Sequence, residues 1–358
     1  MLERLRCAGV LTRADLSRGT GLTVQSAVRL IDSLQARGLV VMGKTLARGG
    51  RGKPGVAVTV AATYGHTLGV SIATDVLTLA LLDFTGRMLA VIERPLSGVT
   101  AAEVLAQLCE ADGALLAGLP ASPGPRLGVG VAMTGFFTGA QGRINPPEPL
   151  RELGEVELGP WLAEALTQPV WVDNDGSVAA AGEAMLGAGR RYRDFGYLYF
   201  SYGLGGGLVV DGQVVRGAHG NAGEYAGMLP ALGLERATLE LLRQLLLEDG
   251  VVLPDVRALL HCYDPQWPAI ECWVARSAPG VSLIVSALTA SCDPEAVVFG
   301  GRLPRDLATR LIAAVNIDNQ PRRGQGRPLP SLLPAEAPVD AAAIGAATLP
   351  LMAWYYAD

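Results

Sequence analysis

Three segments decide how this chain folds: Trp171-Val-Asp-Asn-Asp-Gly-Ser-Val-Ala-Ala-Ala-Gly-Glu183, Ser201-Tyr-Gly-Leu-Gly-Gly-Gly-Leu-Val-Val-Asp-Gly212 and Gly217-Ala-His-Gly-Asn-Ala-Gly-Glu224. In the first segment an amide and carboxylates follow a predicted strand, which suits the binding and deprotonation of a sugar hydroxyl. In the other two, glycines allow backbone N–H groups to approach a phosphate or a polyol closely. We therefore expect one ligand site built from all three segments.

The composition describes a globular protein of two or three structural units. Of its 358 residues, 50 % are hydrophobic and 18 % charged, which suits large buried cores and excludes a disordered chain. No apolar run reaches the roughly 18 residues of a membrane span, and the amino terminus lacks the apolar region of a signal peptide. The cysteines are scattered and odd in number, so we expect reduced thiols and a cytoplasmic location. They are Cys7, Cys109, Cys262, Cys272 and Cys292.

The net charge of −5 hides a division along the chain. Residues 1–60 hold ten basic and three acidic side chains, a net charge of +7, whereas the remaining residues hold 19 and 31, a net charge of −12. A small basic unit on an acidic body indicates that only the first unit meets a polyanion.

The basic unit begins with a helix-turn-helix pattern. Thr12 caps a first helix, and Asp15 stands where the carboxylate of a capping box belongs. Gly19-Thr-Gly-Leu22 forms the turn and Thr23 caps a second helix. The apolar positions of the second helix repeat at helical spacing and are Val24, Ala27, Val28, Ile31 and Leu34.

The polar face of the second helix predicts DNA binding, because the N-terminal part of a recognition helix enters the major groove. Gln and Arg can form paired hydrogen bonds with base edges there, and Ser can hydrogen-bond to a phosphate. Two short strands, 39–42 and 56–60, flank a basic loop that forms a wing for phosphate or minor-groove contact. The predicted DNA contacts are Thr23, Gln25, Ser26, Arg29, Arg48, Arg51 and Lys53. The alternative is a helical hairpin that docks a partner protein.

The acidic body predicts an α/β fold with two groups of strands. The first group has strands at 66–72, 76–82, 87–94 and 126–132, with a helix at 101–116. The second group has strands at 197–202, 206–210 and 296–302, with helices at 234–247, 279–292 and 339–348.

Together these segments resemble the ROK family (repressors, open reading frames and sugar kinases), and the resemblance covers essentially the whole chain. It implies an N-terminal winged helix-turn-helix over 1–60 followed by a two-lobed, actin-like body of the ribonuclease-H type. The first lobe would span 61–181 and be completed by a C-terminal helix at about 335–358. The second lobe would span 182–334.

The resemblance also implies that the phosphate side of the site is degraded. ROK kinases carry Asp-Ile-Gly-Gly-Thr in the first hairpin, where the small residues admit the nucleotide phosphates and the Asp serves magnesium. The matching segment here is Ser71-Ile-Ala-Thr-Asp75, which lacks both glycines and the first carboxylate. Asp75 lies four positions after Ser71, so it could replace the missing carboxylate only if the backbone followed a different path. Tyr202 takes the usual Thr position of the second phosphate segment.

The sugar side matches the family better. Asn174 and Asp175 match the amide that orients the sugar and the base that deprotonates its hydroxyl. Glu224 matches a hydroxyl-binding glutamate, Asn145 lies where a further sugar contact is common, and Gly135 marks the backbone turn beneath the ligand. Asp175 and Glu224 could instead serve as a helix cap or an internal hydrogen-bond partner.

The zinc site of the family is missing. Gly227 occupies the position of the metal-binding His, and the loop that normally holds three cysteines is deleted, so we expect no structural zinc and no cofactor. Glu235 follows the deletion and is a candidate sugar contact. We interpret His66, His219 and His261 as surface or hydrogen-bonded residues rather than metal ligands.

The leading hypothesis is a DNA-binding transcriptional regulator, of the repressor type, whose body senses a sugar or sugar derivative. We expect a homodimer or a higher homo-oligomer that binds a double-stranded operator, because one winged helix reads one half-site, and we expect no membrane partner. One alternative is a sugar kinase with Asp175 as general base. Another is a regulator that has lost its sugar input, so that its body serves as a dimerisation platform.

Overall fold

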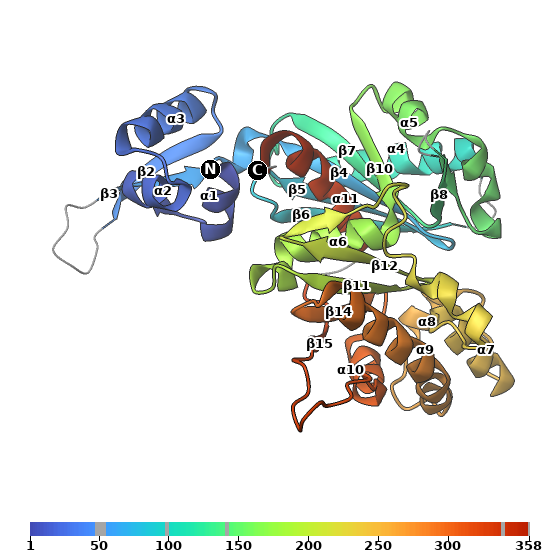
Figure 1. Cartoon of the computed structure of the whole chain (residues 1–358). Helices are drawn as coiled ribbons and strands as arrows, with labels where there is room; N and C mark the ends of the chain where they lie inside the picture. The colour runs from blue at the N-terminus through green and yellow to red at the C-terminus, as the bar shows by residue number, and fades with distance from the viewer. Residues whose placement is uncertain (47–54, 97–99, 140–142, 338–340, 357–358) are drawn as a thin grey trace.

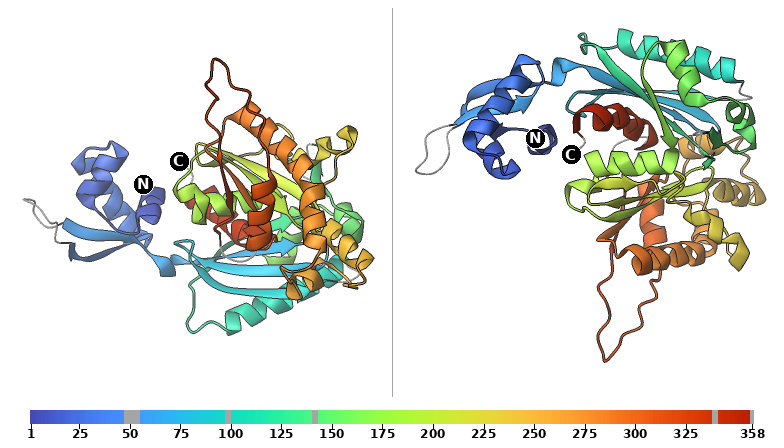
Figure 2. Two further views of the ribbon diagram at one scale, coloured as in Figure 1. Left: turned by 90° about the horizontal axis from the view of Figure 1, so that it is seen from below. Right: turned by 45° about the horizontal axis from the view of Figure 1, so that its top comes forward.

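In the computed structural model, which describes residues 1–46, 55–96, 100–139, 143–337 and 341–356, a small N-terminal unit joins a larger two-lobed body. Each lobe is built on a five-stranded sheet, and two helices lie between the sheets (Figures 1 and 2). This is the mixed α/β, actin-like body that the sequence predicts.

The N-terminal unit contains three helices and a three-stranded antiparallel sheet in the order β1-β3-β2. Its elements are α1 (Leu2–Ala8), β1 (Leu11–Thr12), α2 (Arg13–Thr20), α3 (Val24–Ala36), β2 (Val40–Leu46) and β3 (Gly55–Val60). Both predicted helix starts are confirmed. Thr12 and Asp15 form a reciprocal capping box on α2, and the Thr23 hydroxyl accepts the Ser26 backbone N–H at 3.2 Å.

The prediction for Val24 is wrong. We expected this residue on the buried face of α3, but its side chain is 61 % exposed. Ala27, Ile31 and Leu34 are buried as predicted. Val24 is the first residue of α3, and the buried stripe of this helix starts one turn later.

The first lobe has a sheet in the order β10-β7-β4-β5-β6, in which β10, β7 and β4 run parallel. The strands are β4 (His66–Ile72), β5 (Val76–Asp83), β6 (Met88–Pro95), β7 (Arg126–Met133) and β10 (Val170–Asn174), and a short hairpin adds β8 (Phe136–Thr138) and β9 (Arg143–Asn145). Apolar side chains of α4 (Ala101–Ala117) and α5 (Leu158–Leu166) pack against one face of this sheet.

The second lobe has a sheet in the order β13-β12-β11-β14-β15. Its elements are β11 (Phe195–Phe200), β12 (Leu204–Val210), β13 (Gln213–Val215), α7 (Leu239–Glu248), α8 (Val256–His261), α9 (Ala269–Cys292), β14 (Ala296–Gly301), α10 (Arg305–Ala314) and β15 (Ser331–Pro334). Two predicted helix starts need correction. α7 begins after its cap Thr238 rather than at 234, and α9 begins ten residues before Pro279, which lies inside it.

Among the described residues, α9 is the helix whose length and composition would allow it to cross a membrane, a test that core helices of soluble proteins also pass. Trp273, Val281 and Ile284 of this helix are fully buried in the core of the second lobe. We therefore interpret α9 as a core helix.

Two helices fill the space between the sheets: α6 (Asp175–Leu186) and α11 (Ala341–Leu351), which continues into a π-helical turn, η6 (Met352–Tyr356). Every residue of α11 is buried. Residue 182, the expected boundary between the lobes, lies inside α6.

Glycines allow the backbone of α11 to lie directly against the backbones of the first sheet and of α6. A Cβ at Gly130 of β7 would lie 1.8 Å from the Ala346 carbonyl oxygen, and one at Gly69 of β4 would lie 2.0 Å from that of Ala343. On the other side, a Cβ at Gly345 would lie 2.0 Å from the Val178 carbonyl oxygen of α6.

The Gly130→Ala variant should lose about 3 kcal/mol or more of unfolding free energy, because the methyl group would overlap the backbone of α11. Gly113→Ala is the matched control: this helical glycine of α4 has open space around it, and alanine should add about 0.5–1 kcal/mol. Urea titration followed by circular dichroism measures both. Equal stability of the two variants would contradict this account of the packing.

Candidate functional site

A cavity of about 140 Å³ lies between the lobes, at the C-terminal ends of β7 and β10 and the start of β12. It is lined by Thr134, Gly135, Phe136, Asn174, Asp175, Tyr199, Ser201, Gly203, Leu204, Gly205 and Glu224. Three predicted ligand residues, Asn174, Asp175 and Glu224, therefore meet in one cavity, together with the predicted turn residue Gly135.

The Asn174 side chain has a structural role as well as a place in the cavity. Its oxygen accepts the backbone N–H groups of Gly176 and Ser177, at 2.9 and 3.2 Å, and so caps α6. Its NH₂ group donates to the carbonyl oxygen of Gly135. Gly135 has a φ of 139° and lies against the backbone of Asn145, so a side chain at this turn would be strained. These bonds hold the amide in one orientation.

The Asp175 carboxylate is buried at the first turn of α6, with 6 % of the residue exposed. One oxygen accepts the Thr134 hydroxyl at 2.7 Å, and the other accepts the Gly176 backbone N–H at 2.9 Å. The carboxylate thus lies at the N-terminal, positive end of the α6 dipole. A carboxylate held in this way can accept a hydrogen bond from a ligand hydroxyl.

Glu224 lies at the exposed rim of the cavity, after Gly223. Partial desolvation raises the pKa of its carboxyl group, and the nearby Arg236 opposes this shift. Glu224 therefore adds a second carboxyl group that can bind a ligand hydroxyl.

The other two predicted contacts do not line this cavity. Asn145 ends β9 with an exposed side chain, paired with Phe136 of β8. Glu235 is held by Arg276, whose Nε lies 2.6 Å from its carboxylate. Thr134, Tyr199 and Ser201 line the cavity but were not predicted as contacts. Ser201 is, however, the first residue of the glycine-rich segment 201–212 that the sequence singles out.

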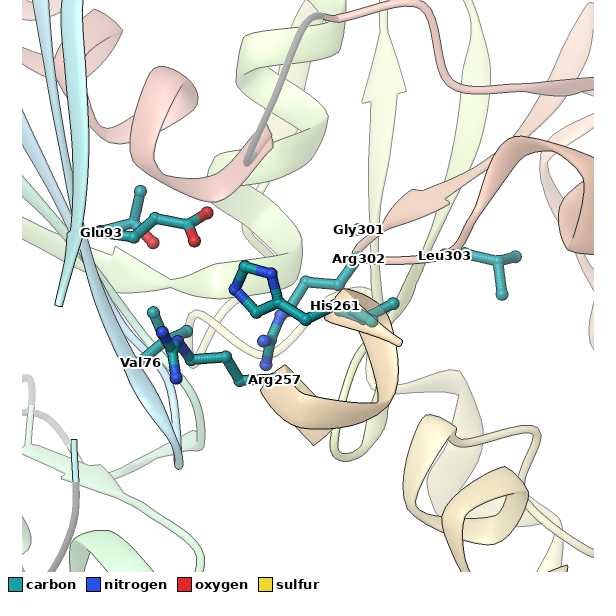
Figure 3. A pocket seen from close by; sticks show the side chains of 9 residues that line it. Val76, Glu93, Arg257, His261, Gly301, Arg302 and Leu303 are labelled. Atoms are coloured by element: carbon teal, nitrogen blue, oxygen red, sulfur yellow. The ribbon is translucent and has the colours of Figure 1, made fainter. Parts of the chain in front are cut away.

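A second cavity, of about 320 Å³, lies between the lobes beside the segment that matches the kinase phosphate turn. Figure 3 shows Val76 and Glu93 of the first lobe on one side and Arg257, His261 and Arg302 of the second lobe on the other.

Asp75, next to this cavity, is held by groups of the second lobe. Its carboxylate accepts one hydrogen bond from the Arg302 guanidinium and one from the Arg257 backbone N–H, each at 2.6 Å. Within the described parts of the chain, the neighbouring Thr74 hydroxyl is buried without a hydrogen-bond partner. Side chains and an intramolecular ion pair therefore occupy the segment that matches the kinase phosphate turn.

No group of three or more His, Cys, Asp or Glu residues within the described ranges could hold a metal ion. Gly227, at the expected metal-ligand position, lies in a 3-10 turn (Tyr225–Met228). His66 is buried and hydrogen-bonded: Arg126 Nε donates to its Nε2, so its Nδ1 donates to the Gly124 carbonyl oxygen. Burial, and secondarily Arg126, lowers the pKa of His66. Its protein contacts are those of a neutral structural histidine.

At the other end of the molecule, Thr23, Gln25, Ser26 and Arg29 are all exposed around the N-terminal end of α3. The predicted wing contacts Arg48, Arg51 and Lys53 lie outside the described residues.

The ROK family model matches residues 67–232, which confirms the predicted ROK domain for this part of the chain.

Related proteins include both enzymes and repressors. An uncharacterized protein of Sinorhizobium fredii is 27 % identical over 97 % of this chain and 88 % of that protein. The bifunctional enzyme NanE/NanK of Brucella melitensis is 35 % identical over 48 % of this chain and 34 % of the enzyme. A xylose repressor of Bacillus spizizenii is 24 % identical over 64 % of this chain and 59 % of the repressor. The alignments thus span about a third of the enzyme and less than two thirds of the repressor.

Two similar solved structures likewise include an enzyme and a transcriptional regulator. The ROK hexokinase from Thermus thermophilus superposes with a TM-score of 0.58 at 25 % identity, covering 79 % of this chain and 96 % of the hexokinase. A ROK family transcriptional regulator, a homologue of the E. coli Mlc protein, superposes with a TM-score of 0.69 at 20 % identity, covering 96 % of this chain and 92 % of the regulator. The second likeness concerns the fold alone.

The Asn174→Ala variant should lose about 1–2 kcal/mol of unfolding free energy without any ligand, because the amide caps α6. Asn174→Ser is the control, since serine caps helices about as well as asparagine but, like alanine, lacks the NH₂ group that bonds to Gly135. Chemical denaturation of the full chain measures the difference. An unchanged stability of Asn174→Ala would contradict the capping role and leave the amide a pure ligand contact.

Proposed function

We propose that this chain, which carries a ROK domain over residues 67–232, is a cytoplasmic DNA-binding transcriptional regulator, of the repressor type, that senses a sugar or sugar derivative. The observation that carries the proposal is the set of exposed polar side chains at the start of α3, on a unit whose net charge is +7.

In this proposal residues 1–60 are a winged helix-turn-helix. α2 ends at Gly21, whose φ of 68° makes the turn, and α3 follows as the recognition helix. The antiparallel strands β2 and β3 form the wing. Gln25 and Arg29 supply hydrogen bonds to base edges, and the exposed Val24 beside them can contact a thymine methyl group. The solved regulator covers 96 % of the chain and the hexokinase 79 %, which supports this assignment for the N-terminal unit.

We further propose a homodimer as the DNA-binding form. One recognition helix covers one half-site, so a two-fold operator requires two copies. Ligand binding between the lobes would then regulate DNA binding if the two conformations differ in ligand affinity.

The proposed sugar site is the cavity around Asn174, Asp175 and Glu224. Two carboxyl groups and an oriented amide supply the hydrogen bonds that a polyol requires, and the similarity to a xylose repressor supports a sugar as ligand.

A sugar kinase is the second candidate. The bond between Thr134 and Asp175 orients a carboxylate suited to deprotonate a hydroxyl, and an enzyme and a hexokinase are among the similar proteins. Phosphoryl transfer depends on positioned metal and phosphates. The ion pair of Asp75 with Arg302 and the presence of Ser71 in place of a carboxylate favour the regulator.

The Arg29→Ala variant should bind its selected operator about 1–3 kcal/mol more weakly and lose base preference at one position of the site. Arg37→Ala is the matched control, because Arg37 is also exposed but follows the opposite end of α3. An operator selected from random DNA, then titrated with both variants at one salt concentration, measures the difference. Equal affinity of the unsubstituted protein for all sequences would overturn the proposal.

Sugar kinase turnover should be negligible with glucose, mannose, N-acetylated hexosamines, fructose and xylose, because the phosphate turn is occupied by the protein's own ion pair. A coupled ADP-release assay measures it. Turnover near 1 s⁻¹ or above, within the ordinary enzyme range and abolished by Asp175→Asn, would favour the kinase instead.

A further inference from the structure

A cavity of about 200 Å³ lies where the N-terminal unit meets the body. Its walls come from α1, α6, the β12–β13 turn, α11 and the π-helical turn η6. Most of the wall is apolar: Ala181, Ala184, Met185, Val214, Leu349 and Met352. The cavity is separate from the proposed sugar site and shares no lining residue with it.

The walls are held in place without a ligand. The β12–β13 turn is a two-residue hairpin in which Asp211 and Gly212 both have positive φ, and the Asp211 N–H donates to Asp194 at 2.6 Å. Helix α6 is held through its fully buried Glu183, which accepts the backbone N–H groups of Ala188, Glu336 and Ala337 at 2.8–3.0 Å. Ala181 and Ala184 are small, which leaves space between these walls.

Three polar side chains also line the cavity: Glu3, Gln213 and Arg216. Glu3 forms an ion pair within its own helix, because Arg6 donates to its two oxygens at 2.7 and 2.6 Å. Arg216 forms an ion pair with Asp173 at 2.8 Å, and its own side chain is 58 % exposed. A guanidinium group has five donors, so Arg216 can pair with Asp173 and still bind a second anion. Both charged side chains of the cavity are therefore ion-paired, and what favours an anionic ligand is that the guanidinium of Arg216 has donors beyond those its pair with Asp173 uses.

We propose that this cavity binds a small monocarboxylic acid with an apolar ring or branched chain. The carboxylate would pair with Arg216, and the apolar part would lie between Ala184 of α6 and the side chains of Leu349 and Met352. The size fits, since an apolar cavity of about 150 Å³ in another protein holds benzene. Methionine side chains adapt to ligands of different shape, and two of them line this cavity.

Binding would also act on the N-terminal unit. Glu3 belongs to α1, so a ligand in the cavity contacts both α1 and the body. It would add contacts that hold α1 in its present position. This effect does not depend on DNA binding or on the sugar site.

The test uses the full chain and three probes of similar size: benzoate, neutral benzamide and cationic benzylammonium. Isothermal titration calorimetry should show saturable binding of benzoate, with benzamide about tenfold weaker or worse because its neutral carbonyl accepts a weaker hydrogen bond from the guanidinium than a carboxylate does. Preferential binding of benzylammonium would assign the cavity to a cation at Glu3 and overturn the proposal. Equal binding of benzoate and benzamide, or no saturable benzoate binding, would also overturn it.

Variants place the binding site. Ala184→Leu should abolish benzoate binding by filling the cavity, whereas Ala114→Leu, an exposed position on α4, should leave it unchanged. Arg216→Lys should retain binding and Arg216→Gln should weaken it about tenfold. In hydrogen exchange, benzoate should increase the protection of residues 2–8. Full benzoate affinity in a folded Ala184→Leu variant would show that the acid binds elsewhere.

Discussion

Helix α11 packs into the interior of the body at backbone distance, and glycines make room for it on both sides. Gly69 and Gly130 lie on the neighbouring strands β4 and β7, and Gly345 faces α6. Because interiors are close-packed, such contacts fix the relative positions of the elements they join. The C-terminal ends of β4 and β7 and the N-terminal end of α6 are therefore set by this packing. Those ends carry Thr134 and Asp175, which form the floor of the proposed sugar site.

A single helix, α6, joins the features that function requires. It begins at the cap Asn174, in the proposed sugar site. Near its other end Glu183 accepts the backbone N–H groups of Glu336 and Ala337, which precede α11. The carbonyl oxygen of Met185 accepts a hydrogen bond from Arg6 of the N-terminal unit. A rigid element with both ends engaged can transmit a displacement that a flexible loop would absorb.

The junction itself extends this path. Arg6 lies over the ring of Tyr356, 5.6 Å from its centroid, and the Tyr356 hydroxyl donates to the carbonyl oxygen of Phe84. Leu5 of α1 belongs to the same apolar cluster as Phe84 and Tyr356. The N-terminal unit thus shares an apolar core with the body. A displacement in the body would therefore act directly on α1.

Much of this architecture was predictable from local patterns. Strand 66–72 was predicted with its observed bounds, and Asn174 with Asp175 came from one contiguous segment. The segments that meet only in three dimensions were not predictable. Glu235 pairs with Arg276, 41 residues away, and Asp75 pairs with Arg302, 227 residues away. Val24 was misplaced because helical spacing shows which face a residue shares but not where neighbouring elements stop covering that face.

The ion pair of Asp75 with Arg302 lies at the segment that matches the phosphate turn of the kinases. The exposed fractions of the two side chains are only 7 and 9 %. A buried pair forms at a desolvation cost, and removing one partner leaves a buried charge that is more costly still. The backbone N–H of Arg257 also donates to Asp75, so the pair holds the first lobe against α8 of the second. Returning a carboxylate to position 71 and glycines to positions 73 and 74 would widen the turn but leave this bridge in place. A nucleotide phosphate would then have to compete with Asp75 for Arg302. Recovery of ATP binding therefore depends on Asp75 and Arg302 as well as on the segment that matches the kinase turn.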